Sequence, residues 1–225
     1  MNQTLNRNVI ILLSGLAGVL AAVLVGVGEF LMHFDAQGRF GEGYGDYEFM
    51  EGIGGERSTI GHFLAVLGAP LYLVGYWHLM KMLEPANKIV ARIAFFLMSY
   101  GIIVGAVWIG SRASISSLVN VEQTGDITEF VKLYALRYEN LLSVTRVAVL
   151  VFSAIFIWLC LTGRSHYPRW MAIFNPILLL VSCFLIWMVS PGIGIYIMPI
   201  ALNVSFGIVF MVSIYLSLKS NKQSN

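Results

Sequence analysis

Charged residues are scarce in this sequence: Asp, Glu, Lys and Arg together make up 12% of its 225 residues. A soluble globular domain has about 25% charged residues, with which it covers its surface. Hydrophobic residues make up 58% of the chain, and the mean hydropathy is +0.78. The composition therefore excludes an ordinary soluble domain and indicates a chain whose main partner is the lipid bilayer.

Several functional classes are excluded by what else is missing. The only two cysteines, Cys160 and Cys183, lie inside apolar runs, which argues against a disulfide framework or a cysteine zinc site. The net charge is only +2 and no basic run occurs outside short loops, so nucleic acid is not an expected partner. The chain contains no nucleophile elbow, Walker motif or dinucleotide fingerprint, so no motif identifies an enzyme class.

Long apolar runs are the dominant feature of the sequence. Each is close to the roughly 20 residues that a helix needs to cross a hydrocarbon core of about 30 Å. They cover residues about 9–30, 60–80, 93–111, 141–163, 170–189 and 193–218. The sequence therefore predicts an all-α, polytopic integral membrane protein, a single membrane domain with six transmembrane helices.

The distribution of basic residues predicts the orientation of these spans, because cytoplasmic loops are enriched in Lys and Arg. With the N-terminus inside, the short inner segments carry eight of them: Arg7, Lys81, Lys88, Arg92, Arg164, Arg169, Lys219 and Lys222. The longer outer segments carry five: Arg39, Arg57, Arg112, Lys132 and Arg137. Both termini are therefore predicted to be cytoplasmic, and helical spans favour a bacterial inner membrane.

Two long loops, 35–59 and 113–138, then lie outside. The first is rich in glycine and acidic residues, and the second contains apolar residues at helical spacing, from Ile127 to Tyr138. Loops of this length usually carry function or are disordered. For the second we expect either an interfacial helix or an outward extension of the fourth span.

Small residues mark the faces on which the helices are expected to pack, since they allow close approach in lipid. In the first span a small residue recurs every four positions, at Ser14, Gly18, Ala22 and Gly26. The same stripe, continued outward, reaches Glu29. Such faces also allow oligomerisation with another chain.

Polar residues fall on these inward faces, in the predicted outer half of the membrane. Ionisable groups at membrane depth cost a few kcal/mol and are kept mostly where they have a partner or a task. The residues are Glu29, His33, His62, Arg112, Glu139, Arg146 and Asn203. Their convergence predicts a polar pocket that opens outward.

One interpretation of this pocket is a binding site for a small molecule or a lipid headgroup. Arg112 and Arg146 would hold an anionic group, and Glu29, Glu139 and Asn203 would complete the polar wall. The alternative is purely structural: Glu29 would pair with Arg112 or Arg146, or Arg146 with Glu139, with no ligand.

A second interpretation is a divalent metal site. Glu29 and His33 are four residues apart on one helix, at a spacing that lets both bind one ion. With His62 and Asp35 they would form a set of two histidines and two carboxylates, which suits zinc, manganese or iron. A metal placed there could activate water at the outer surface.

Three segments carry a resemblance to a known family. They are GEFLMHF at the end of the first span, APLYLVGYWHLM in the second and YPRWMAIFNP before the fifth. With these segments the chain resembles an uncharacterised family of small bacterial multi-pass membrane proteins. The resemblance implies the six-helix architecture and identifies no catalytic residue.

Three functions remain open at this point. The first is binding of a small molecule or lipid headgroup in the outward pocket, with or without metal-assisted chemistry. The second is a secondary transporter or proton-coupled carrier, in which Glu29 and Arg146 exchange partners. The third is a structural or partner-binding subunit whose polar cluster only holds the helices together.

Overall fold

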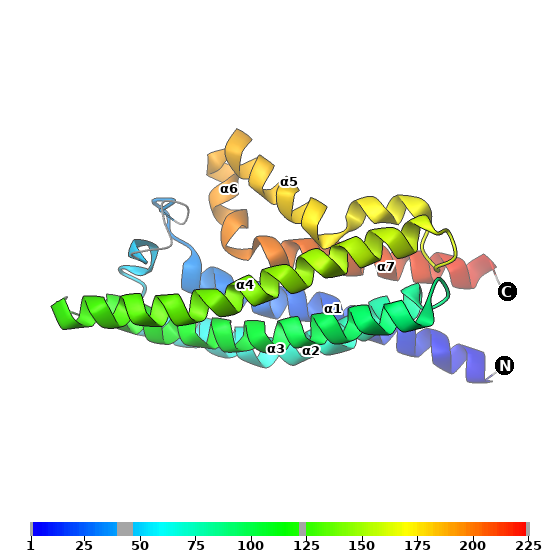
Figure 1. Ribbon diagram of the computed structural model, residues 1–225, viewed down its shortest axis with the longest axis horizontal. Coiled ribbons are helices and arrows are strands. Elements are labelled where there is room, and N and C mark those ends of the chain that lie inside the picture. The colour runs from blue at the N-terminus through cyan, green and yellow to red at the C-terminus, as the bar shows by residue number, and fades with distance from the viewer. Residues whose placement is uncertain (1, 40–46, 122–124, 224–225) are drawn as a thin grey trace.

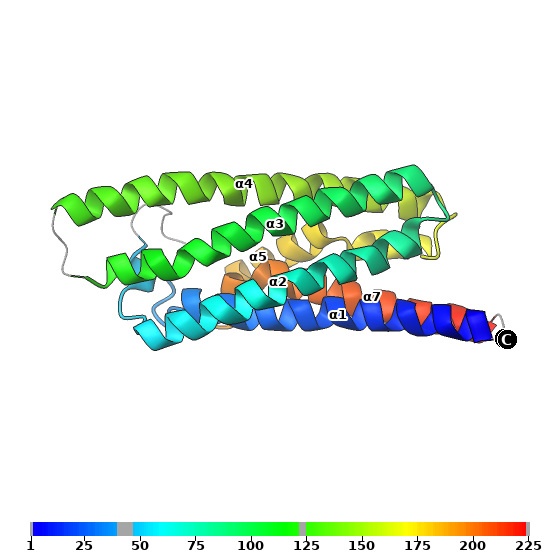
Figure 2. The same ribbon diagram turned by 90° about the horizontal axis from the view of Figure 1, so that it is seen from below.

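The computed structural model describes residues 2–39, 47–121 and 125–223, and throughout this part the regular secondary structure is helical. Four long helices run antiparallel along the molecule, and α7 lies beside them (Figures 1 and 2). The α-helices are α1 (Asn2–His33), α2 (Gly55–Leu83), α3 (Lys88–Val119), α4 (Gly125–Leu161), α5 (Pro176–Val189), α6 (Pro191–Ile197) and α7 (Ala201–Gln223). Short 3₁₀ segments are η1 (Glu48–Met50), η2 (Arg169–Phe174) and η3 (Met198–Ile200).

Within the described residues, five helical stretches are long and apolar enough to cross a membrane. They are Asn8–His33, Gly55–Leu83, Lys88–Val119, Glu129–Leu161 and Pro191–Lys219. Large apolar side chains lie on the outside of the bundle, among them Leu67, which is 72% exposed. Since such a surface is stable against hydrocarbon and not against water, the fold indicates a membrane protein.

The predicted fifth span, 170–189, is broken in the structure. It consists of η2 and the 14-residue helix α5, separated at Asn175. Pro176 has no N–H to continue a helix, and the extended Asn175 caps α5 by accepting a hydrogen bond from Leu178 N. At 1.5 Å per residue α5 is only about 21 Å long, so it does not cross a core of about 30 Å by itself.

The predicted outer loop 113–138 is mostly helix. α3 continues to Val119, and α4 begins at Gly125 and runs without a break for 37 residues. The reason is local: neither Gly nor Pro interrupts residues 126–161, and the outer turns gain a small core of their own. The segment is therefore a continuation of the fourth predicted span and not a separate interfacial helix.

Helices α1 and α2 approach so closely that only glycine fits at several contacts. A Cβ on Gly28 would lie 2.5 Å from the carbonyl oxygen of Gly61, and a Cβ on Gly75 would lie 2.6 Å from Gly18 Cα. The predicted stripe from Ser14 to Gly26 is buried at each of its four positions. The prediction that this stripe is a packing face is confirmed.

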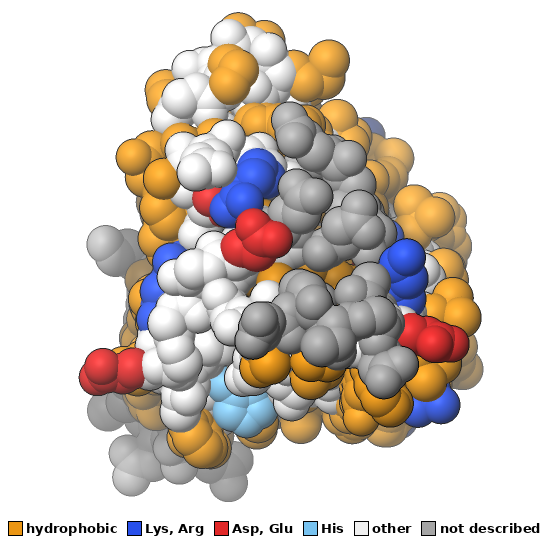
Figure 3. Space-filling view, turned by 90° about the vertical axis from the view of Figure 1, so that its left-hand side faces the viewer, with side chains coloured by type: hydrophobic (Ala, Val, Ile, Leu, Met, Phe, Trp, Pro, Cys, Tyr) orange, Lys and Arg blue, Asp and Glu red, His pale blue; other side chains and the backbone are white. Residues whose placement is uncertain are grey.

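The N-terminal end of α1 and the C-terminal end of α7 lie at one end of the bundle. The α1–α2 and α3–α4 connections lie at the other end (Figures 1 and 2). Seen from the latter end, several charged side chains lie on the end face and its rim, among hydrophobic side chains (Figure 3). Residues 40–46 of the glycine-rich loop lie outside the described part. The candidate site lies beneath this charged end, which we call the loop end.

Candidate functional site

A cavity of about 310 Å³ lies between α1, α3, α4, α5 and α7. Four polar side chains line it: Glu29, His33, Arg112 and Arg146. The other lining residues are apolar: Phe49, Trp108, Leu142, Val149, Ile177, Leu180, Phe184, Trp187, Met198, Pro199, Ala201 and Leu202. A mainly apolar cavity with a few polar groups on one part of its wall is the usual form of a small-molecule site.

Arg112 is the most completely buried charged residue of this wall, with 2% of its surface exposed. Its Nη2 donates a hydrogen bond to Glu139 Oε1 at 2.6 Å. Its guanidinium carbon lies 4.3 Å from the centre of the Trp108 ring and 5.2 Å from that of Tyr47. The carboxylate and the two ring faces hold the guanidinium in one place, since each attracts a cation.

Two other nitrogens of the Arg112 guanidinium find no acceptor among the residues that the structure describes. They are Nε and Nη1, and both are buried. A buried donor left unsatisfied costs about 1–3 kcal/mol, and more when it is charged. An acceptor for these two N–H groups is therefore expected, and an anionic oxygen is the acceptor that suits a guanidinium best.

Tyr47 belongs to the cover of the site at the loop end. Its hydroxyl donates to Glu139 Oε1 at 3.0 Å, and its backbone has a φ of 48°, which is rare for a residue with a Cβ. Burial raises the pKa of Tyr47 to about 12, so the phenol stays protonated and able to donate at neutral pH. With Phe49, Met50 and Ile53 it packs in a separate apolar cluster against the outer turns of α3 and α4.

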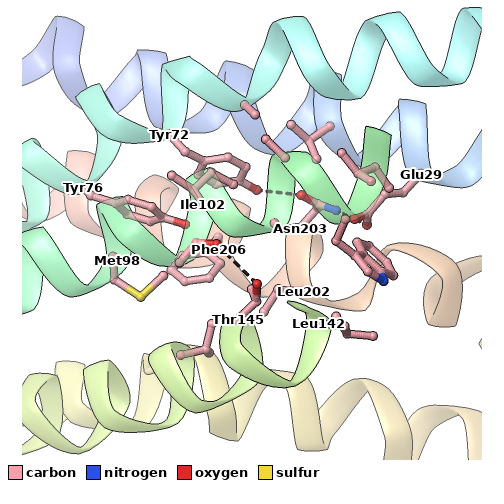
Figure 4. A pocket seen from close by; sticks show the side chains of 18 residues that line it. Glu29, Tyr72, Tyr76, Met98, Ile102, Leu142, Thr145, Leu202, Asn203 and Phe206 are labelled. Carbon is pink, nitrogen blue, oxygen red and sulfur yellow. Dashed lines mark hydrogen bonds between the residues drawn. The ribbon is translucent and has the colours of Figure 1, made fainter. Parts of the chain in front are cut away.

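Glu29 lies at the junction of this cavity with a second, deeper one of about 60 Å³, because it lines both. Asn203 donates from Nδ2 to Glu29 Oε2, and Asn203 Oδ1 accepts a hydrogen bond from the Tyr72 hydroxyl at 2.8 Å. Figure 4 shows this chain of three side chains along the deeper cavity, with the Tyr76 hydroxyl pointing into it. Asn203 thus fixes one oxygen of Glu29, while the other has no hydrogen bond to a described residue.

Of the five predicted ligand-binding residues, three line one cavity and each of the other two contacts one of these three, and Arg146 is exposed. Glu29, Arg112 and Arg146 line the larger cavity. Glu139 and Asn203 do not line it, but hydrogen-bond to Arg112 and Glu29 respectively. The ionic partner of Arg112 is Glu139 and not Glu29.

The structure does not bring the four predicted metal ligands to one place. Glu29 and His33 share the cavity, whereas Asp35 is held by Arg39, whose Nε donates to Asp35 Oδ2 at 2.9 Å. This hydrogen bond keeps the pKa of Asp35 below its usual value.

His62 does not line the cavity and lies beside Gly110, at the contact between α2 and α3. In the described part of the chain no three His, Cys, Asp or Glu side chains form a group able to hold a metal ion.

Sequence reasoning missed two sets of residues. The first is Trp108, which lies under Arg112 and lines both cavities. The spacing from Trp108 to Arg112 is i to i+4 on one helix, and this signal would have paired them. The α5 residues Phe184 and Trp187 carry no comparable signal, because every position of α5 is apolar or small.

In its described residues the protein is helical, with five helices long and apolar enough to cross a membrane and a buried arginine beside a largely apolar cavity. A family model described as "Family of unknown function (DUF6796)" matches residues 1–222, so the chain belongs to this family. The expected resemblance to an uncharacterised family is thereby confirmed. Comparisons with curated proteins and with solved structures find no match.

Proposed function

We propose that this protein binds a small molecule or lipid headgroup that carries an anionic group, in the cavity beside Arg112. The observation that carries this proposal is the buried guanidinium with two N–H groups that no described residue accepts. Arg146 lines the same cavity and adds a second cation. Two arginines that line one cavity suit a phosphate or carboxylate.

The arrangement around Arg112 favours a binding role over a purely structural ion pair. A structural pair would be expected to satisfy the guanidinium fully, since buried polar groups are nearly always hydrogen-bonded. Glu139 accepts a hydrogen bond only from Nη2 of Arg112, and two aromatic rings lie against the guanidinium. Nε and Nη1 have no acceptor among the described residues, and in the proposed function a ligand supplies one.

We further propose six membrane crossings with both termini in the cytoplasm of a bacterial inner membrane. Four crossings are α1 to α4; η2 with α5 leads outward again, and α6 with α7 returns. The excess of Lys and Arg near the connections opposite the loop end supports this orientation. The cavity then belongs to the outer half of the membrane.

Labelling of single cysteines tests the orientation. In a chain with Cys160 and Cys183 replaced by alanine, we expect a membrane-impermeant maleimide to label Gly54→Cys in intact cells. Arg164→Cys should be labelled only after the membrane is opened, since both positions are exposed but lie at opposite ends of the bundle. The reverse pattern would contradict the proposed orientation, and labelling of both in intact cells would contradict the crossing number.

Native mass spectrometry of the detergent-purified protein tests the binding function. We expect wild type to retain one anionic molecule per chain, and Arg112→Gln to lose it. The matched control is Arg137→Gln on α4, because Arg137 is exposed and does not line the cavity. Loss of the same molecule in both variants, or its retention in Arg112→Gln, would contradict a site at Arg112.

A further inference from the structure

We propose that the ligand of this cavity is an anionic amphiphile that enters sideways from the bilayer between α4 and α5. Its anionic group would bind Arg112, and its hydrocarbon chain would lie along α5. The inference rests on the proposed function, which it extends by naming the class of ligand and its route.

The first observation is the separation of polar and apolar groups along the cavity. Arg112, His33 and Glu29 come from the loop ends of α3 and α1, and the fourth polar residue, Arg146, lies on α4 three residues before Val149. Because α4 runs inward from the loop end, Val149 lies roughly 10 Å deeper than Leu142, at 1.5 Å per residue. Val149 and Ile177 form an apolar part of the wall on that deeper side. A ligand that satisfies both regions has a charged end and a hydrocarbon part.

The second observation is the position of α5. This helix leans away from the bundle, and α6 turns the chain back toward it (Figure 1). Phe184 lines the cavity and is 43% exposed, while its neighbours Val181 and Leu185 are exposed on the same helix. The cavity therefore meets the apolar flank of the molecule at α5, which in a membrane faces the acyl chains.

The third observation is size. A volume of about 310 Å³ is at the lower end of the roughly 300–1,000 Å³ of small-molecule sites. It accommodates a headgroup and the first carbons of a chain, and the remainder must lie elsewhere. An opening between α4 and α5 leaves that remainder in the hydrocarbon of the bilayer, where it costs nothing to keep.

Thermal denaturation of the full-length protein in a non-ionic detergent tests this inference. The probes are inorganic phosphate, butyl phosphate, lysophosphatidic acid with a 16-carbon chain, and the uncharged monoacylglycerol of the same chain. We expect lysophosphatidic acid to stabilise the protein with an apparent Kd at least about tenfold below that of butyl phosphate, because two further buried methylenes suffice for that factor. The monoacylglycerol should produce no shift.

A pair of variants on α5 locates the chain. Leu180→Trp places a larger side chain in the cavity and should weaken lysophosphatidic acid binding at least about tenfold, a change of 1.4 kcal/mol. Leu185→Trp is the control, because Leu185 is 54% exposed and does not line the cavity. Binding unchanged in Leu180→Trp would overturn the proposed position of the chain.

The other outcomes separate the two proposals. Equal affinity for butyl phosphate and lysophosphatidic acid, lost in Arg112→Gln, would overturn the amphiphile and leave the proposed anion site standing. Equal stabilisation by lysophosphatidic acid and the monoacylglycerol would show that charge plays no part. Stabilisation by none of the probes would count against both proposals.

Discussion

Replacing Arg112 by methionine is expected to lower the free energy of unfolding by about 3 kcal/mol. Glu139 would lose its cationic partner while only 21% of its side chain is exposed, and breaking a buried pair by removing one partner typically costs about 3–5 kcal/mol. The value lies at the low end because Glu139 keeps some contact with solvent and the hydrogen bond from Tyr47. Reversible unfolding in mixed detergent measures the change.

The double variant Arg112→Met with Glu139→Leu gives the sharper result. It removes both charges, so we expect it to be more stable than Arg112→Met alone, as buried ion pairs replaced by apolar residues often are. The same double variant should bind no anion. If the two single changes simply add, the side chains are not energetically coupled and the account of the site is contradicted.

Gly75→Ala is expected to destabilise the protein by roughly 1–3 kcal/mol, although it adds only a methyl group. The new Cβ would lie 2.6 Å from Gly18 Cα and 2.7 Å from the Phe210 ring. Backbone cannot rotate away as a flexible side chain can, so α1 and α2 would have to separate. The midpoint of thermal unfolding in detergent should fall accordingly.

Gly55→Ala on the same helix is the matched control. A Cβ at Gly55 meets nothing within 4 Å, and alanine has a higher helix propensity than glycine. We expect an unchanged or slightly raised unfolding midpoint. Equal destabilisation by both substitutions would show that close approach of α1 and α2 is not what requires glycine at position 75.

Much of the helical architecture could be predicted from the sequence, because a chain in lipid must satisfy its backbone internally and apolar runs of sufficient length leave few alternatives. The fifth span is the exception. Pro176 cannot continue a helix, but the direction in which α5 leaves the bundle depends on its packing against η3, α6 and α7. That packing is tertiary information, which no local pattern contains.

The site was predicted in part for a related reason. Inward faces defined by small residues predicted that Glu29 and Arg112 lie near one another, and both line one cavity; Arg146 lines it too but is exposed, not on an inward face. His62 was predicted to line the same pocket and does not. It comes one residue after Gly61, and Gly61 is the residue that packs on α1. One residue is a rotation of about 100° on a helix, and this turns His62 toward Gly110 of α3.

Residues beyond a helix end could not be placed by facial patterns at all. Asp35 follows α1, and the register of the turn after His33 was not readable from the sequence. Its carboxylate accepts hydrogen bonds from the backbone N–H and the side-chain Nε of Arg39, four residues later. Tyr47, which completes the site from the same connection, was missed for the same reason.

Native mass spectrometry tests most directly whether Arg112 holds an anionic ligand. The proteins to compare are wild type, Arg112→Gln and Arg137→Gln. The account predicts one additional mass per chain in wild type and in Arg137→Gln, identified as an anion on release, and the bare chain in Arg112→Gln. An additional mass that survives in Arg112→Gln, or a wild-type chain that carries none and takes up no offered anion, would contradict it.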